Sequence, residues 1–176
     1  MNTAMVNGYE HNGRIYKSPV GQIPKIVNNF KPATDNQKIL YNKISDFNNQ
    51  LILCHGIAGT GKTYVSVYKA LQDVLRRGTP YNRLIIINPT VDVGNEDKLG
   101  YLPGELDKKI QQYNESTFTI LDSIVGKGKS QKLIADGKVQ VGVLNFLRGV
   151  NLDECYVILD EAQNVSPMQV KTLITR

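Results

Sequence analysis

The sequence predicts an α/β fold with a mainly parallel sheet flanked by helices. One observation is a set of short runs that are apolar throughout, as in strands buried on both faces. Helical patterns separate these runs, which favours a parallel sheet with crossover helices. A glycine-rich loop follows the first run and two acids follow the last, so polar chemistry gathers at the carboxyl ends of strands. The expected strands lie at 50–56, 83–90, 139–144 and 155–159.

The chain divides into an irregular N-terminal arm, residues 1–30, and one domain, residues 31–176. The arm is rich in Asn, Gly and Tyr and shows no period. The domain opens with a helix that Thr34 or Asp35 caps. Its expected apolar face comprises Ile39, Leu40, Ile44 and Phe47.

Further helices are expected between the strands. One follows the glycine loop and stops at Gly78-Thr79-Pro80, and Ser166-Pro167 opens another in the usual cap-then-proline order. Residues 105–113 and 116–126 predict two more. The segment from Gly126 to Lys132 reads as a solvated flexible loop, with contact to backbone phosphates as the alternative.

Composition indicates an ordinary globular domain, with 41% hydrophobic and 21% charged residues among 176. The N-terminus lacks the apolar core of a signal peptide, so a cytoplasmic location is expected. Cys54 and Cys155 fit no metal spacing, and both are expected to be buried.

The net charge is unevenly distributed along the chain. Residues 1–88 hold 11 Lys and Arg against 4 Asp and Glu, which suits a polyanionic partner such as nucleic acid; solvated surface lysines are the alternative.

The segment GIAGTGKT matches the phosphate-loop pattern G-x-x-x-x-G-K-[ST]. Glycines let backbone N–H groups converge on a phosphate, and the following helix adds the positive end of its dipole. The lysine would reach the β- and γ-phosphates of ATP, and the threonine hydroxyl would ligate Mg²⁺. The expected nucleotide contacts are Gly56, Ile57, Ala58, Gly59, Thr60, Gly61, Lys62, Thr63 and Tyr64.

Two carboxylates end the last apolar run. Asp160 would hold Mg²⁺ through water, and Glu161 would polarise the attacking water. Gln163 follows at the spacing of a γ-phosphate sensor; a capped polar residue at a helix start is the alternative. The expected catalytic residues are therefore Lys62, Glu161 and Gln163.

The loop and the DEAQ segment together resemble the superfamily-one helicase core. Three longer blocks resemble the PhoH family, the phosphate-starvation-inducible ATPases. They are GIAGTGKTYVSVYKAL, NPTVDVGNEDKLGYLPGELDKKI and FLRGVNLDECYVILDEAQNVSPMQVKTLITR, of which LGYLPG and FLRG…LDEAQN are the most specific. The resemblance implies a RecA-like P-loop NTPase domain.

The resemblance also implies roles for residues outside the loop. Gln37, with Phe30 and Thr34 upstream, resembles the element that reads adenine through its amide; a polar residue in a first helical turn is the alternative. Thr90 and Val91 stand where the helicase family touches nucleic-acid backbone. Arg148 matches the family's arginine-glycine element, with an exposed loop arginine as the equal alternative.

The order of family motifs stops after DEAQN, so we hypothesise a truncated or split form of a longer ATPase. In RecA-like sheets the expected next strand lies between the loop strand and the Asp160 strand. The leading expectation is a Mg²⁺-dependent ATPase coupled to single-stranded nucleic acid, RNA first, in a homo-oligomer such as a hexamer. The alternative is a nucleotide-binding regulatory protein with little hydrolysis. A small-molecule kinase is disfavoured because no arginine-rich lid segment is seen.

Overall fold

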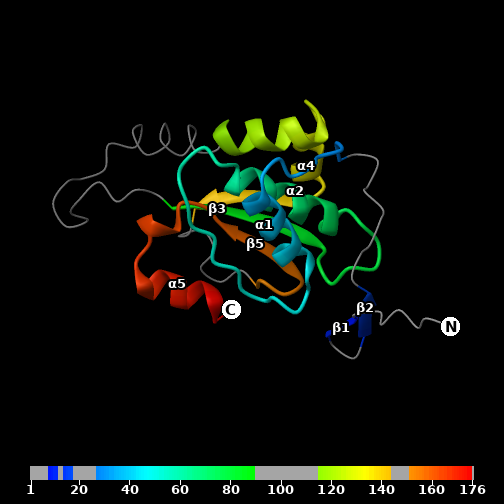
Figure 1. The fold of residues 1–176 in the computed structure, drawn as a ribbon. Helices are drawn as coiled ribbons and strands as arrows, with labels where there is room; N and C mark the ends of the chain where they lie inside the picture. The colour runs from blue at the N-terminus through cyan, green and yellow to red at the C-terminus, as the bar shows by residue number, and fades with distance from the viewer. Residues whose placement is uncertain (1–7, 12–13, 18–26, 90–114, 144–150, 176) are drawn as a thin grey trace.

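The computed structural model describes residues 8–11, 14–17, 27–89, 115–143 and 151–175. Helices lie on both sides of a small central sheet (Figure 1). A further helical stretch covers residues 115–125. The other elements are β1 (Gly8–His11), β2 (Arg14–Lys17), α1 (Asp35–Ser45), α2 (Lys62–Val74), β3 (Arg83–Asn88), α4 (Lys129–Ala135), β4 (Val139–Val143), β5 (Cys155–Leu159), the 3-10 turn η2 (Ala162–Asn164) and α5 (Pro167–Ile174).

The central sheet has the order β4-β3-β5, and both of its ladders are parallel. Ile86 lies opposite Val141 on one side and Ile158 on the other. Residues Leu84 to Ile87 are at most 1% exposed, whereas all of β5 is only half-buried. The predicted α/β class with a parallel sheet is confirmed, and the three apolar runs that form β3, β4 and β5 are strands as expected.

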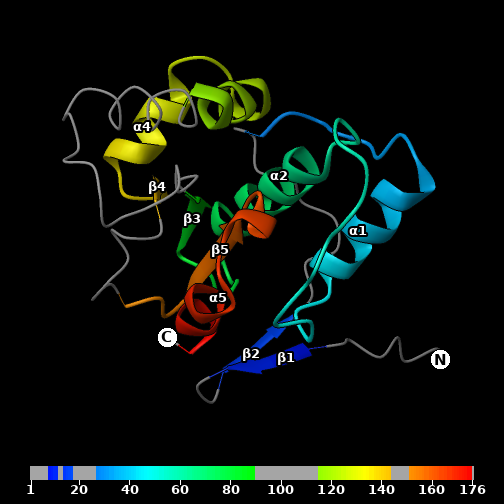
Figure 2. The ribbon, with the colours of Figure 1, turned by 90° about the vertical axis from the view of Figure 1, so that its left-hand side faces the viewer.

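Alternation along β3 divides the core between the two faces of the sheet. Leu84 and Ile86 belong to the larger cluster, which includes α2, residues 115–125 and α4. Ile85 and Ile87 point to the other face, where Leu173 of α5 packs. The views at right angles agree on this layering (Figures 1 and 2).

Local sequence explains where the site-bearing helices start. Thr34 is the N-cap of α1, and its hydroxyl accepts a hydrogen bond from the Gln37 N–H. Ser166 caps α5 in a capping box with Gln169, and proline occupies the first turn. Both helices therefore begin where the polar signals predicted.

The expected strand at 50–56 is wrong. Residues 51–57 form no ladder with any described strand, and Leu53 is 85% exposed. The segment runs on the β5 side of the sheet, away from β4 (Figure 2). An apolar run becomes a strand only when a neighbour pairs its N–H and C=O groups, and among the described residues none does so here.

Other expectations also need correction. Cys54 is exposed rather than buried, because it lies in the unpaired segment, and Cys155 is half-buried. Ile39 is 58% exposed, because α1 turns only part of its apolar set inward. The expected loop at 126–132 contains the start of α4, and Leu133 buries itself in the core.

The N-terminal arm is more regular than expected, because β1 and β2 pair as an antiparallel hairpin. The predicted helix at 105–113 lies outside the described residues. Among the residues that the structure describes, no helix is long and apolar enough to cross a membrane.

Candidate nucleotide-binding site

The glycine-rich loop connects the unpaired segment to α2. Gly59 and Gly61 have φ angles of +75° and +82°, a region in which side chains are strained. Gly61 is the N-cap of α2 and makes no side-chain cap. The first N–H groups of α2 therefore keep their hydrogen-bonding capacity for an anion at the helix start.

Lys62 folds back over the loop. Its ammonium donates to the carbonyl oxygens of Gly56 and Ile57, both at 2.9 Å. An ammonium has three N–H donors, so one remains for a phosphate oxygen. These two hydrogen bonds fix the positive charge of Lys62 beside the loop carbonyls.

Thr63 joins the loop to the end of β5. Its hydroxyl lies 3.0 and 3.1 Å from the two carboxylate oxygens of Asp160, although the two residues are 97 positions apart. A hydroxyl that donates to the carboxylate still has lone pairs for a metal ion. Asp160 accepts with only part of its capacity, so it can also accept from a metal-bound water. This oxygen set fits Mg²⁺, which takes one or two protein oxygens plus water and phosphate.

Glu161 follows in an unusual backbone conformation. Its φ is +48° in the left-handed region, which costs energy for a residue with a side chain. Its N–H donates to a carboxylate oxygen of Asp160 at 3.1 Å, and the Glu161 side chain is exposed. The amide of Gln163 donates to the Glu161 carboxylate. Glu161 and Gln163 thus lie together beside Asp160.

Gln37 contacts the loop from α1. Its Nε2 donates to the Thr60 carbonyl at 3.0 Å, and its Oε1 accepts from the Ala33 N–H at 2.8 Å. A Cβ placed on Gly61 would lie 3.0 Å from the Gln37 nitrogen, so the contact is close. The amide retains one N–H and one lone pair for a ligand.

The other residues expected to contact nucleotide or nucleic acid lie in different surroundings. The Tyr64 ring packs 5.2 Å from the Phe30 ring, and the Tyr64 backbone N–H lies in the first turn of α2, where it could meet a phosphate. Ile57, Ala58 and Thr60 are exposed at the loop surface. Thr90, Val91 and Arg148 lie outside the described residues.

Sequence reasoning missed two features of this site. It gave no role to the Thr60 carbonyl, which accepts from Gln37, and it did not anticipate the left-handed backbone at Glu161. Any residue has a main-chain carbonyl, so the sequence does not indicate which one accepts a hydrogen bond. The left-handed backbone of Glu161 is also not indicated, because residues in that conformation are usually glycine.

A parallel sheet with a glycine loop at a helix N-terminus, and with an acid from another strand beside it, defines a P-loop nucleotide-binding protein. The chain belongs to the PhoH family: its residues 29–176 match that family, described as PhoH-like protein. This is in general a family of P-loop ATPases.

Curated relatives support the assignment. The chain is 39% identical over 128 residues to a PhoH-like protein of Bacillus subtilis, covering 73% of this chain and 39% of the relative. It is 34% identical over 146 residues to a PhoH-like protein of Mycobacterium tuberculosis, covering 83% of this chain and 40% of the relative. It is 33% identical over 129 residues to Protein PhoH of Escherichia coli, covering 72% and 35%. The chain therefore spans well under half the length of these relatives.

Proposed function

We propose that this protein binds ATP with Mg²⁺ and hydrolyses it in a reaction coupled to single-stranded nucleic acid, RNA first. The observation that carries the proposal is the contact between Thr63 and Asp160. It brings the phosphate loop and the acidic end of β5 into one site, as Mg²⁺-dependent phosphoryl transfer requires.

Each residue of the site has a stated task. Lys62 and the loop N–H groups would bind the phosphates and neutralise charge that develops on them. Thr63 and Asp160 would hold Mg²⁺, which supplies Lewis-acid stabilisation of the phosphate oxygens. Glu161 would orient a water and accept its proton, and Gln163 would hold the Glu161 carboxylate in place.

Turnover tests the chemical part of this proposal. Glu161→Gln keeps the size of the side chain and removes its basicity. We expect it to retain ATP binding and to lose turnover by roughly 10²–10⁴-fold. Equal turnover by the wild type and this variant would contradict a catalytic role for Glu161.

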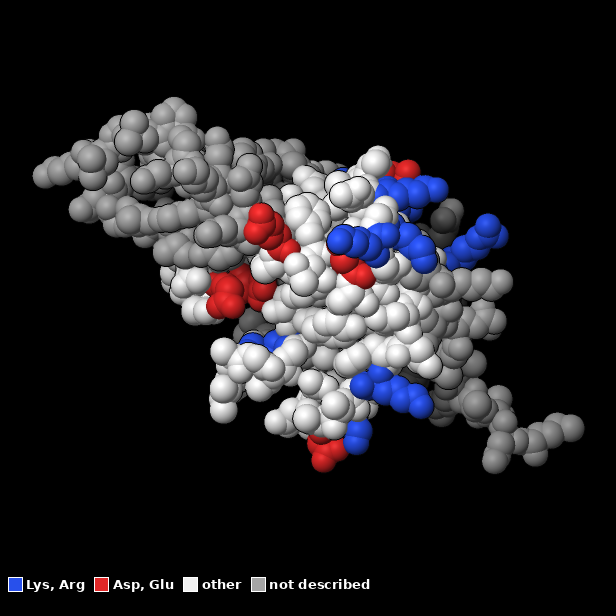
Figure 3. All heavy atoms as spheres, turned by 90° about the horizontal axis from the view of Figure 1, so that it is seen from above, with Lys and Arg blue, Asp and Glu red and all other residues white. Residues whose placement is uncertain are grey.

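Coupling to nucleic acid is proposed from charge. The first 88 residues carry a net charge of +7. Several Lys and Arg side chains lie on the face that Figure 3 shows, with Asp and Glu side chains among them. The exposed lysines in and just before α4 are Lys127, Lys129 and Lys132. Thr90, Val91 and Arg148 remain proposed contacts through the family resemblance.

Single-stranded RNA should therefore stimulate ATP turnover, and the stimulation should fall with added salt because phosphate contacts release counterions. Single-stranded DNA and duplex RNA serve as comparisons. No stimulation by any of the three would contradict the coupling. A homo-oligomer, such as a hexamer, and a cytoplasmic location are part of the same proposal.

One observation favours a second candidate function. β5 has no partner on its outer edge among the described residues, and residues 51–57 form no ladder. A chain with this open sheet could bind Mg-ATP as a regulatory protein and hydrolyse little of it. Binding with background turnover, unchanged by Glu161→Gln, would identify this alternative.

A further inference from the structure

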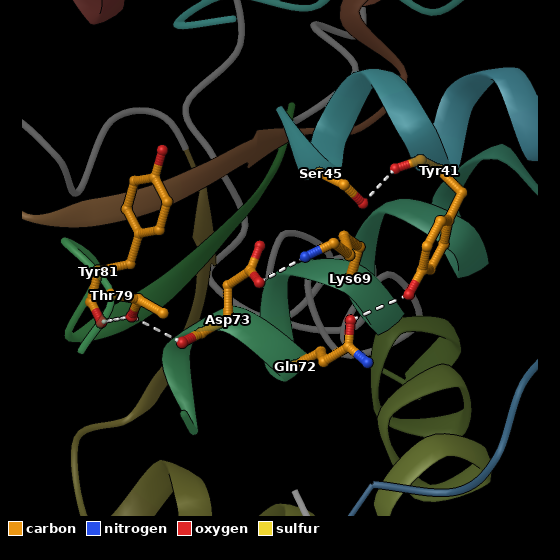
Figure 4. Close-up of polar contacts among 7 residues, drawn as sticks. All are labelled: Tyr41, Ser45, Lys69, Gln72, Asp73, Thr79 and Tyr81. Carbon is orange, nitrogen blue, oxygen red and sulfur yellow. Dashed lines mark hydrogen bonds and ion pairs between the residues drawn. The ribbon is translucent and has the colours of Figure 1, made fainter. Parts of the chain in front are cut away.

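The helix that follows the phosphate loop buries an unusual polar face. Lys69 is 2% exposed, Gln72 4% and Asp73 0%. Their spacing of three and four residues puts them on one side of α2. Figure 4 shows this face directed at α1, with Tyr41 beside Gln72. Charged residues are rarely buried completely unless they are paired.

Lys69 and Asp73 are paired with each other. The ammonium donates to one carboxylate oxygen of Asp73, and the other oxygen has no partner among the described residues. Burial raises the pKa of Asp73 and lowers the pKa of Lys69, which shows that desolvation opposes both charges. Such a pair is weak evidence for stability and is better explained by specificity of packing.

The pair lies beside a side-chain hydrogen bond that joins α1 to α2. The Tyr41 hydroxyl donates to the Gln72 side-chain oxygen at 3.1 Å. The Lys69 ammonium is 6.0 Å from the centre of the Tyr41 ring, at the outer range of a cation–π contact. The Tyr41 side chain is thus restrained at both its hydroxyl and its ring.

Apolar packing of α1 rests on few residues, among them Tyr41, whose ring lies 6.4 Å from the Tyr68 ring in the larger core cluster. Ile44 is the only buried residue of the helix, and Ile39 is 58% exposed. A hydrophobic contact is not directional, whereas the buried Gln72 amide needs a hydrogen-bond partner, which the half-buried Tyr41 hydroxyl supplies. The hydrogen bond to Gln72 therefore selects one position of α1 along α2.

We propose that Tyr41 and Gln72 are positioning residues for nucleobase recognition, which they serve by setting the register of α1 on α2. Gln37 is four residues before Tyr41 and so lies on the same face of α1. A slip of one residue moves a helix by about 1.5 Å, which is enough to break the 3.0 Å bond from Gln37 to Thr60. The inference rests on the proposed function, because it assumes that Gln37 meets the base of a bound nucleotide.

The chemistry of Gln37 defines the base it would select. Its amide keeps one N–H and one acceptor lone pair after its contacts with Thr60 and Ala33. Adenine offers the matching edge, an N7 acceptor beside an N6 donor, whereas guanine offers two acceptors, N7 and O6. Correct placement of the amide should therefore favour ATP over GTP.

The test compares affinities for Mg-ATP and Mg-GTP in Tyr41→Phe and Gln72→Met, each of which removes one side of the hydrogen bond. We expect the preference for ATP to fall by about fivefold in each, by weaker ATP binding with GTP binding unchanged. Tyr156→Phe is the matched control. The Tyr156 hydroxyl makes no hydrogen bond to α1 in the described structure, and its ring packs on Tyr81 instead.

Combined variants separate positioning from general damage. Adding Tyr41→Phe to Gln37→Ala should not lower the preference for ATP further, because the amide that Tyr41 positions is gone. The Ala33 N–H, bonded to Gln37, should exchange its proton faster in Tyr41→Phe even without nucleotide. An unchanged ATP-to-GTP ratio in both single variants, with wild-type exchange at Ala33, would overturn the inference. Failure of the wild type to bind either nucleotide would instead overturn the proposed function.

Discussion

At the residue scale, the site depends on a few contacts between distant parts of the chain. The phosphate loop is local in sequence, but Asp160, the metal ligand proposed beside it, is not. The hydroxyl of Thr63 makes this connection. A change that removes only the hydroxyl should therefore act on Mg²⁺ and leave the glycine loop intact.

Thr63→Val keeps the shape of the side chain and removes its oxygen. We expect the Mg²⁺ concentration needed for half-maximal ATP binding to rise about tenfold or more, because one proposed ligand is lost. Thr63→Ser, which restores the hydroxyl, is the control and should stay near wild type. A titration with Mg²⁺ at fixed ATP measures this. Equal Mg²⁺ dependence for the Val and Ser variants would contradict the metal role of Thr63.

The buried pair in α2 gives a second residue-scale prediction. Lys69→Met leaves the Asp73 carboxyl buried without its partner and should lower the free energy of unfolding by about 3 kcal/mol. The double variant Lys69→Met with Asp73→Leu should recover most of this loss, because no unpaired charge remains. Urea unfolding measures both. A double variant less stable than the single one would show that the pair contributes net stability.

At the element scale, the predictable strands and helices are those whose own residues indicate them, through apolar runs or helix caps. β3 contains the aliphatic run Leu84–Ile87, β5 is apolar throughout, and α5 carries its cap and proline. The segment 50–56 looked equally strand-like, yet pairing partners decide strand formation and they are not a local property. α4 was missed because Gly126 and Gly128 precede it and its lysines resemble those of a loop, whereas Leu133 anchors it in the core.

The cap of α5 can be tested by itself. Ser166→Ala removes the hydroxyl that accepts from the Gln169 N–H and should cost about 1 kcal/mol of stability. Thr172→Ala removes a hydroxyl bonded to the Met168 carbonyl within the same helix and is the control, with little loss expected. Thermal unfolding compares them. Equal loss from both would mean that the cap does not fix the start of α5.

Some residues of the candidate site could be predicted from the sequence and others could not. The loop, Thr63 and Asp160 were predictable because their residue types at their spacing are tied to phosphate and metal chemistry. The support of Gln37 by Tyr41 was not, because its acceptor Gln72 is 31 residues away and nothing local indicates burial of that face.

At the scale of the whole molecule, the outer edge of β5 has no strand partner among the residues that the structure describes. The residues of β5 are half-buried, and Leu51 and Leu53, in the unpaired segment on the β5 side of the sheet (Figure 2), are 60% and 85% exposed. Apolar side chains beside an unpaired strand edge are suited to a further strand that would cover both. We propose that a longer PhoH-like chain provides this strand.

Cys54 reports on this proposal because it lies in the exposed segment, while Cys155 is half-buried. In the 176-residue chain a thiol reagent should modify Cys54 faster than Cys155. In a longer chain that supplies the strand, Cys54 should be protected. Cys54→Ser identifies the reacting thiol. Equal reactivity of Cys54 in both chains would contradict the proposed strand.

The central claim is that the loop from Gly56 to Thr63 and Asp160 form one Mg-nucleotide site. Isothermal titration calorimetry of ATP into the 176-residue chain, with Mg²⁺ and with EDTA, tests it most directly. We predict saturable binding at one site per chain that needs Mg²⁺, and its loss in Lys62→Ala while the fold, followed by circular dichroism, is retained. Absence of binding in the folded wild type, or binding that is the same in Lys62→Ala, would contradict the claim.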